Sequence, residues 1–182
     1  MKWAAWAVCV GLGVVTSDVQ AFERQWHLGV GLGVGQLPDV SGSGAPFGES
    51  LGPPVVGAHT AYGLSDVFDW RLELTWGLHA LHPEVSDRSH LVSAATGLSY
   101  KLDVIEWIPY LGALVGYHGR FAGPELPGGD EGRHDVGASL ILGLDHAVSR
   151  DLVIGVQLRY SRTLSELDYF TGLLRVEHTW GF

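Results

Sequence analysis

The chain has 182 residues, a length that suits one domain, and its net charge of -9 with a pI near 5.3 argues against a nucleic-acid partner. Although 46% of the residues are hydrophobic, no segment beyond residue 21 has 18 consecutive apolar residues, so we expect no membrane-spanning helix. The only cysteine, Cys9, lies within the first 21 residues, which excludes disulfide and thiol chemistry from the rest of the chain.

Residues 1–21 have the pattern of a secretory signal peptide. Lys2 supplies the positive start, residues 3–15 form the apolar core, and Ala21 is a small residue at the expected cleavage site. An N-terminal membrane anchor is disfavoured because the apolar run is too short to span a bilayer. We therefore expect residues 22–182 to form the exported, mature domain.

Hydrophobicity alternates with a period of two along almost the whole mature chain, which indicates strands. The first stretch, WHLGVGLGVG, places a glycine at every second position and Leu or Val between the glycines. The pattern leaves no room for a helix of any length, so the predicted class is all-β. The expected strands cover residues 26–35, 55–63, 69–79, 90–102, 107–119, 134–144, 151–161 and 169–182.

The connections between these strands are expected to alternate in length. The links after the first, third, fifth and seventh strands are the longer ones, whereas those after the second, fourth and sixth are tight. Short turns at one end and long loops at the other are typical of outer-membrane barrels. The sequence thus predicts an eight-stranded antiparallel up-and-down transmembrane β-barrel, with four long loops outside the cell and both chain ends in the periplasm.

Alternation by itself does not separate a soluble barrel from a membrane barrel, because one is the other turned inside out. The apolar face, however, is too bulky for a narrow interior: residues 70–78 alone place two Trp and three Leu on it. We therefore assign the apolar face to lipid and the glycine-rich polar face to the lumen. Aromatic residues near strand ends fit interfacial girdles: Trp26, Tyr62, Trp70, Tyr100, Trp107, Tyr160 and Trp180.

The polar face carries charged side chains that need partners once they are enclosed with little water. The glycines of the first strand are expected to leave room for long side chains that reach across the lumen, and Asp135 is expected nearer the outer mouth. We predict that Glu73 and Glu177 each lie within salt-bridge reach of an inward Arg or Lys. The expected lumen charge network consists of Arg71, Glu73, Lys101, Arg159, Arg175 and Glu177.

Three stretches, YGLSDVFDWRLEL, GLSYKLDVIEWIPYLGALVGYH and LGLDHAVSRDLVIGVQLRY, resemble small Gram-negative outer-membrane β-barrel proteins of the OmpA and OmpX type. The resemblance covers the whole mature chain. It implies residence in the cell outer membrane as a monomer without a peptidoglycan-binding domain, among outer-membrane lipids and lipopolysaccharide. Members commonly end in an aromatic residue that the barrel-assembly machinery reads, and Phe182, with Trp180 before it, matches this assembly signal.

The family hosts many functions, so the activity has to be argued from the residues. A scaffold that presents loops at the cell surface, with a salt-bridged and largely plugged lumen, is the leading hypothesis, and a narrow channel for small solutes is the alternative. A wide porin is excluded because it needs 16 or more strands. A lipid-modifying enzyme is less favoured: lipid A deacylases use a His-x-Ser pair, and Arg159 stands two residues before Ser161.

No cofactor or metal site is predicted. His79 and His82, with Glu84 just beyond, match no strong ligand spacing. His118 and His134 are candidates to face each other across the loop between them. His178 lies on an otherwise apolar face, where we expect it near the periplasmic interface.

Overall fold

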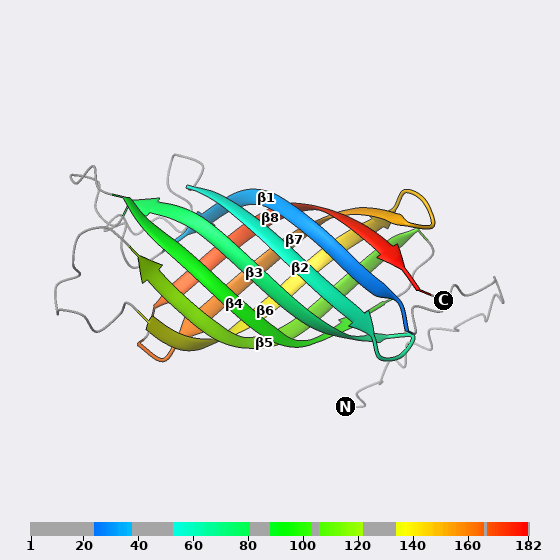
Figure 1. Cartoon of the computed structure of the whole chain (residues 1–182), viewed down its shortest axis with the longest axis horizontal. Coiled ribbons are helices and arrows are strands. Elements are labelled where there is room, and N and C mark those ends of the chain that lie inside the picture. Colours follow the sequence, from blue (N-terminus) through cyan, green and yellow to red (C-terminus); the bar gives the residue numbers. More distant parts are fainter. Residues whose placement is uncertain are drawn as a thin grey trace, which may run out of the picture.

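The computed structural model describes residues 24–37, 53–80, 88–102, 106–121, 134–165 and 167–181. Within them, eight antiparallel strands form one closed barrel in chain order (Figure 1), and no helix long and apolar enough to cross a membrane occurs. The strands are β1 Trp26–Gln36, β2 Pro54–Gly63, β3 Phe68–Ala80, β4 Arg88–Lys101, β5 Trp107–Phe121, β6 His134–Ala147, β7 Leu152–Thr163 and β8 Asp168–Trp180.

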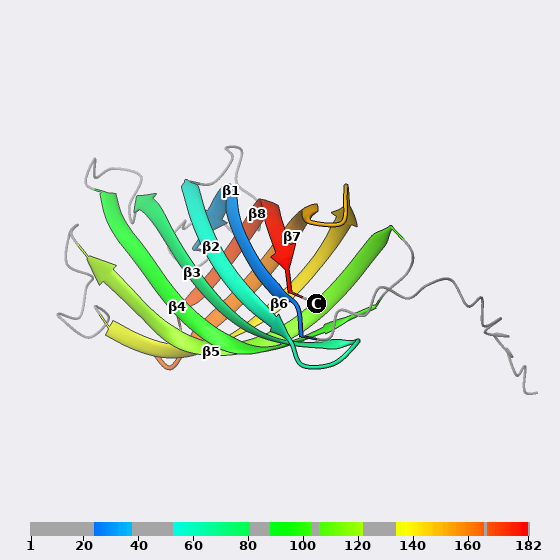
Figure 2. The ribbon, with the colours of Figure 1, turned by 45° about the vertical axis from the view of Figure 1, so that its right-hand side comes forward.

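Each strand pairs with the next along the chain, and the pairing of β1 with β8 closes the barrel. This last seam runs from Trp26 opposite Trp180 to Gln36 opposite Phe170. The β2–β3 turn and the C-terminal end of β8 lie at the same end of the barrel (Figures 1 and 2). We call this the turn end, and the opposite end, where β1, β3, β5 and β7 finish, the loop end.

The predicted long loop after the seventh strand is wrong. Strand β7 continues to Thr163 and β8 begins at Asp168, so the connection is as short as those at the turn end. Asp135 explains this, because its Oδ2 accepts hydrogen bonds from the backbone N–H and the hydroxyl of Ser165. The Leu164 N–H also donates to the Val136 carbonyl at 2.9 Å. These bonds hold the β7–β8 link against β6. The other three loop-end connections are longer than this link, as predicted.

The two faces of the wall have the expected polarity. Arg71 and Glu73 of β3 are buried inside, whereas Leu158 and Leu174 are 63% and 68% exposed on the outside. This arrangement follows from the pleat, since neighbouring residues of a strand point to opposite faces. The barrel is therefore inverted relative to a soluble protein, with its charges inside and its large apolar side chains outside.

Aromatic rings and histidines ring the outer surface at both ends. The turn-end belt contains the pairs Trp26–Tyr62, Phe68–Tyr100, Trp107–His146 and His178–Trp180, with ring centroids 4.6 to 5.7 Å apart. The loop-end belt contains Trp76–His90, Tyr117–His134 and Tyr160–Phe170 at 4.8 to 5.8 Å. Amphipathic rings at two levels, separated by an aliphatic zone, match the girdles of a membrane barrel.

Candidate functional site

Among the residues that the structure describes, the lumen contains eight charged side chains that are each no more than 4% exposed. Four are acidic and four are basic, so their formal charges cancel. Asp69 and Asp145 were not anticipated from the sequence, although each shares the inward parity of its strand. The set is Asp69, Arg71, Glu73, Lys101, Asp145, Arg159, Arg175 and Glu177.

Glu177 of β8 accepts hydrogen bonds from three side chains. Its Oε1 accepts from His27 Nδ1 at 2.6 Å, and its Oε2 accepts from His59 Nε2 at 2.6 Å and from Arg175 Nη2 at 2.7 Å. Arg71 Nη2 of β3 lies 4.0 Å from the same Oε2. One carboxylate therefore joins side chains of β1, β2, β3 and β8, across the seam that closes the barrel.

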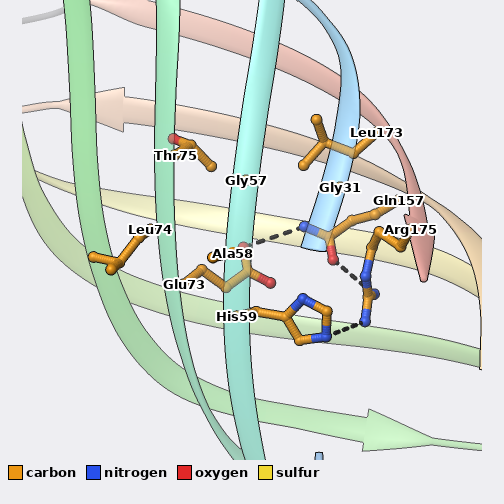
Figure 3. Close-up of a pocket in the computed structure, with 10 residues that line it drawn as sticks. All are labelled: Gly31, Gly57, Ala58, His59, Glu73, Leu74, Thr75, Gln157, Leu173 and Arg175. Atoms are coloured by element: carbon orange, nitrogen blue, oxygen red, sulfur yellow. Dashed lines mark hydrogen bonds between the residues drawn. The ribbon is translucent and has the colours of Figure 1, made fainter. Parts of the chain in front are cut away.

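Arg175 lies beside Glu177 and extends the network to the opposite wall. Its Nη1 donates to the Tyr110 hydroxyl. The same Nη1 donates to Gln157 Oε1 at 2.9 Å (Figure 3). Two guanidinium groups contact the Tyr110 ring, with Arg71 Cζ 4.7 Å and Arg175 Cζ 5.2 Å from the ring centroid. Such contacts with a ring face stabilise cations, most strongly where water is excluded.

Glu73 is a second crossing point. It lies 3.7 Å from Arg71 Nη1 and 3.6 Å from Arg159 Nη1, and its Oε2 accepts from Gln157 Nε2 at 3.2 Å. Because Arg159 and Gln157 belong to β7, Glu73 of β3 links two strands that do not pair with each other. Both Glu73 and Glu177 thus lie within 4.0 Å of arginines from more than one strand.

Lys101 is also buried in the lumen. Its Nζ lies 2.6 Å from Asp69 Oδ2, so it pairs within the β3–β4 hairpin. The sequence analysis grouped Lys101 with the cross-lumen charges because it shares their parity. Its backbone N–H donates to the Val67 carbonyl of the β2–β3 turn, so Lys101 lies toward the turn end.

Glycines on the inner face lie beneath long side chains of neighbouring strands. A Cβ at Gly29 would collide with the His59 ring, and one at Gly143 would collide with the Tyr110 ring. At Gly31 a Cβ would stand 3.3 Å from Arg175 Cγ. Glycine therefore does leave room in the lumen, but for a histidine and a tyrosine as well as for the expected arginine.

Above the charges, toward the loop end, the lumen becomes first neutral and then apolar. Arg159 donates to the hydroxyls of Ser139 and Ser161 at 3.0 and 3.1 Å. Beyond these serines is a buried loop-end apolar cluster that the sequence analysis missed. The cluster consists of Leu37, Val55, Leu91, Tyr169 and Leu173.

A cavity beside this network is very small. Its volume is about 10 Å³, close to what one water molecule needs. Figure 3 shows it between β1 and β2 on one side and the side chains of Gln157 and Arg175 on the other. At this level the interior is occupied by side chains.

The histidine assignments need one correction. His118 is buried inside, whereas His134 lies outside against Tyr117 and Phe121, so the two do not face each other. The register explains this: His118 pairs with Asp135, and the neighbouring His134 necessarily has the opposite parity. The side chain of His79 and all of His82 and Glu84 lie outside the described residues. Within the described ranges, no His, Cys, Asp and Glu side chains have the arrangement of a metal site.

His178 and Trp180 lie in the turn-end belt. His178 is exposed on the outer face, and its Nδ1 donates to the Asp151 carbonyl at 2.8 Å, beside the β6–β7 turn. This is the end that the sequence analysis assigned to the periplasm. Phe182 and the proposed signal peptide, residues 1–21, lie outside the described residues.

Solved structures share this fold. OprG, an outer-membrane protein of Pseudomonas aeruginosa, matches with a TM-score of 0.59 and 11% identity over 88% of this chain and 97% of its own. Neisserial surface protein A gives 0.57 and 16%, over 89% and 99%. Ail, the attachment invasion locus protein of Yersinia pestis, gives 0.55 and 12%, over 87% and 99%.

No protein-family model matches the sequence, and no curated protein sequence matches it. The likeness to solved structures therefore defines the fold, and it does so along nearly the full length of those chains. This fold is the closed, eight-stranded antiparallel barrel of small outer-membrane proteins, as the resemblance predicted.

Proposed function

We propose that this protein is an integral barrel of the outer membrane whose lumen is closed by paired charges, and that it acts as a scaffold presenting its loop-end connections at the cell surface. This proposal is based mainly on the inverted polarity of the barrel: over the described residues, eight charged side chains are buried inside and large apolar side chains cover the outside.

The exterior supports the membrane part of the proposal. Large aliphatic side chains such as Leu140, Leu158 and Leu174 are more than 60% exposed, and both belts flank them. Soluble monomers rarely expose contiguous apolar patches of such extent. Contact between this apolar surface and lipid chains carries no hydration penalty, whereas its exposure to water would be unfavourable.

The interior supports a closed lumen. A conducting bore needs a water-filled path, but here Glu73, Arg159, Arg175 and Glu177 meet across the interior. The loop-end apolar cluster adds a second barrier, since apolar constrictions exclude ions by dewetting. A narrow channel is therefore the second candidate, and it requires this network to open.

The named neighbours support a surface role. One neighbour is the attachment invasion locus protein of Yersinia pestis and another is a neisserial surface protein. We propose lipopolysaccharide and other outer-membrane lipids as surroundings, and the barrel-assembly machinery as the partner that reads Phe182.

Two measurements test this function. Membrane fractionation should place the mature chain with outer-membrane proteins, and its recovery as a soluble periplasmic protein would refute the proposal. Purified protein in planar bilayers should give no steady conductance. A steady ohmic current from the unmodified protein would refute the closed-lumen scaffold and support the narrow channel.

A further inference from the structure

One histidine of the lumen lies between two groups that make opposite demands on it. His59 Nε2 of β2 lies 2.6 Å from Glu177 Oε2 and 2.8 Å from Arg175 Nη2 (Figure 3). A guanidinium N–H only donates, an ionised carboxylate only accepts, and one ring nitrogen carries either a hydrogen or a lone pair. His59 Nε2 therefore satisfies one of these two contacts at a time.

These three side chains, which we call the seam latch, tie β2 to β8 across the strand between them. On β1, Gly29 lies beneath the His59 ring, and a Cβ at Gly31 would stand 3.3 Å from Arg175 Cγ. The latch residues are each no more than 7% exposed. Because β1 has no side chain at these two positions, β2 and β8 contact each other directly and hold the closing seam from inside.

The charged and titratable groups around the latch are already engaged. Arg71 of β3 acts on the His59 ring and lies 4.0 Å from Glu177 Oε2. Each of the four buried lumen carboxylates has an Arg or Lys nitrogen within 4.0 Å. The surrounding groups are His27 of β1, Arg71 and Glu73 of β3, Tyr110 of β5, Asp145 of β6 and Arg159 of β7.

A second proton on His59 would upset the charge balance of the latch. Glu177 would then be shared by three cations, namely the His59 ring and the guanidinium groups of Arg71 and Arg175. The charged ring would also present an N–H to Arg175 Nη2, only 2.8 Å away. Like charges at such a distance repel strongly where water is excluded. Acid therefore acts against the latch.

The small cavity beside the latch gives the repelling groups room to separate. His59 and Arg175 both line it, together with Gln157 (Figure 3). Arg175 Nη1 donates to Gln157 and to the Tyr110 hydroxyl, so movement of this guanidinium weakens the contact between β8 and the opposite wall. A proton taken up at the seam thus loosens the network across the lumen.

We propose that the seam latch is an acid-sensitive switch, which ties β2 to β8 at neutral pH and releases Arg175 when His59 takes up a second proton. Protonation of Glu177 would remove the same bonds, so both events act in one direction. The inference rests on the proposed closed lumen and adds a condition under which that lumen loosens.

Urea unfolding of the protein folded in lipid vesicles tests the switch at neutral pH and at about pH 4, below the range in which histidines ordinarily titrate. The variant is His59→Gln, whose amide does not titrate and supplies one donor for Glu177 and a separate acceptor for Arg175. His59→Asn replaces it should the first variant fail to fold. The matched control is His134→Gln, which lies outside the barrel against Tyr117.

We expect acid to raise the unfolding equilibrium constant of the unmodified protein and of the His134→Gln control alike, because the unfolded chain takes up the proton without this repulsion. The rise should be smaller in His59→Gln, on the order of tenfold. An equal acid response with and without His59 would overturn the switch, and so would an equally reduced response in His134→Gln. Bilayer conductance at neutral pH judges the closed lumen separately.

Discussion

At the scale of single residues, Glu177 is the side chain whose loss we expect to lower the stability of the barrel most clearly. Its carboxylate is buried and accepts hydrogen bonds from His27, His59 and Arg175. Burying a carboxylate is costly, and the cost is offset only while its partners remain in place. The charge network is therefore sensitive to the loss of any single member.

Glu177→Ala should leave Arg175 without its main partner in an interior that has little water. The expected loss is about 3–5 kcal/mol in the free energy of unfolding, and less if water enters. Urea titration of the protein refolded in lipid vesicles measures it. Glu106→Ala, at an exposed turn position, is the control and should change little. An unchanged unfolding midpoint for Glu177→Ala would contradict a structural role for the network.

A second prediction concerns Gly29, one of the glycines on the inner face. In Gly29→Ala the new methyl group displaces the His59 ring, which in turn breaks the bond from His59 to Glu177. We expect a loss of about 1–3 kcal/mol, the usual cost of overpacking. Gly172→Ala is the matched control, since its Cβ would meet only Leu158 Cδ2 at 3.5 Å. Equal unfolding free energies for the two variants would show that Gly29 is not required for packing.

At the scale of elements, alternate residues of each strand face lipid on the outside of the barrel and the lumen on the inside. In β7, Val156 is exposed on the outer face, whereas Gln157 and Arg159 are buried inside. A change at one position therefore tests lipid contact, and a change at the next tests lumen packing.

Val156→Arg places a cation in the middle of the apolar exterior. If this position lies near the bilayer midplane, refolding should be disfavoured by about 2–4 kcal/mol. Val148→Arg, in the exposed β6–β7 turn, is the control and should cost much less, because the penalty falls toward the interface. A neutral result for Val156→Arg in a refolding titration would mean that this face does not meet lipid.

On the scale of the whole molecule, closure by β1 and β8 leaves no free strand edge. A closed barrel satisfies every ladder internally, which is the condition for a sheet within hydrocarbon. It also makes the molecule compact and cooperative, since each strand has two neighbours.

The closed barrel should resist detergent at room temperature. Unheated samples are therefore expected to migrate faster on a gel than boiled samples, because the folded form is more compact. Band positions with and without boiling measure this directly. A single band position under both conditions would argue against a stable closed barrel.

The class of fold was predictable because its signal is local. A period of two needs only neighbouring residues, so strands, lipid-facing sides and the inward position of Arg71, Glu73, Arg159, Arg175 and Glu177 followed from parity. The exception among the connections, the short β7–β8 link, depends on Asp135 reaching Ser165 from another strand. Periodicity carries no information about such a bond.

The sequence by itself determined the strands, the two faces and the inward charges, because side-chain direction in a strand alternates regardless of the partner strand. Only the tertiary structure decided which inward groups meet. The stagger of eight strands around a closed wall brings His27 to Glu177, 150 residues away, pairs Lys101 with Asp69, and gathers Leu37, Val55 and Leu173 into a loop-end apolar cluster. These contacts depend on register and curvature, which are global properties of the barrel.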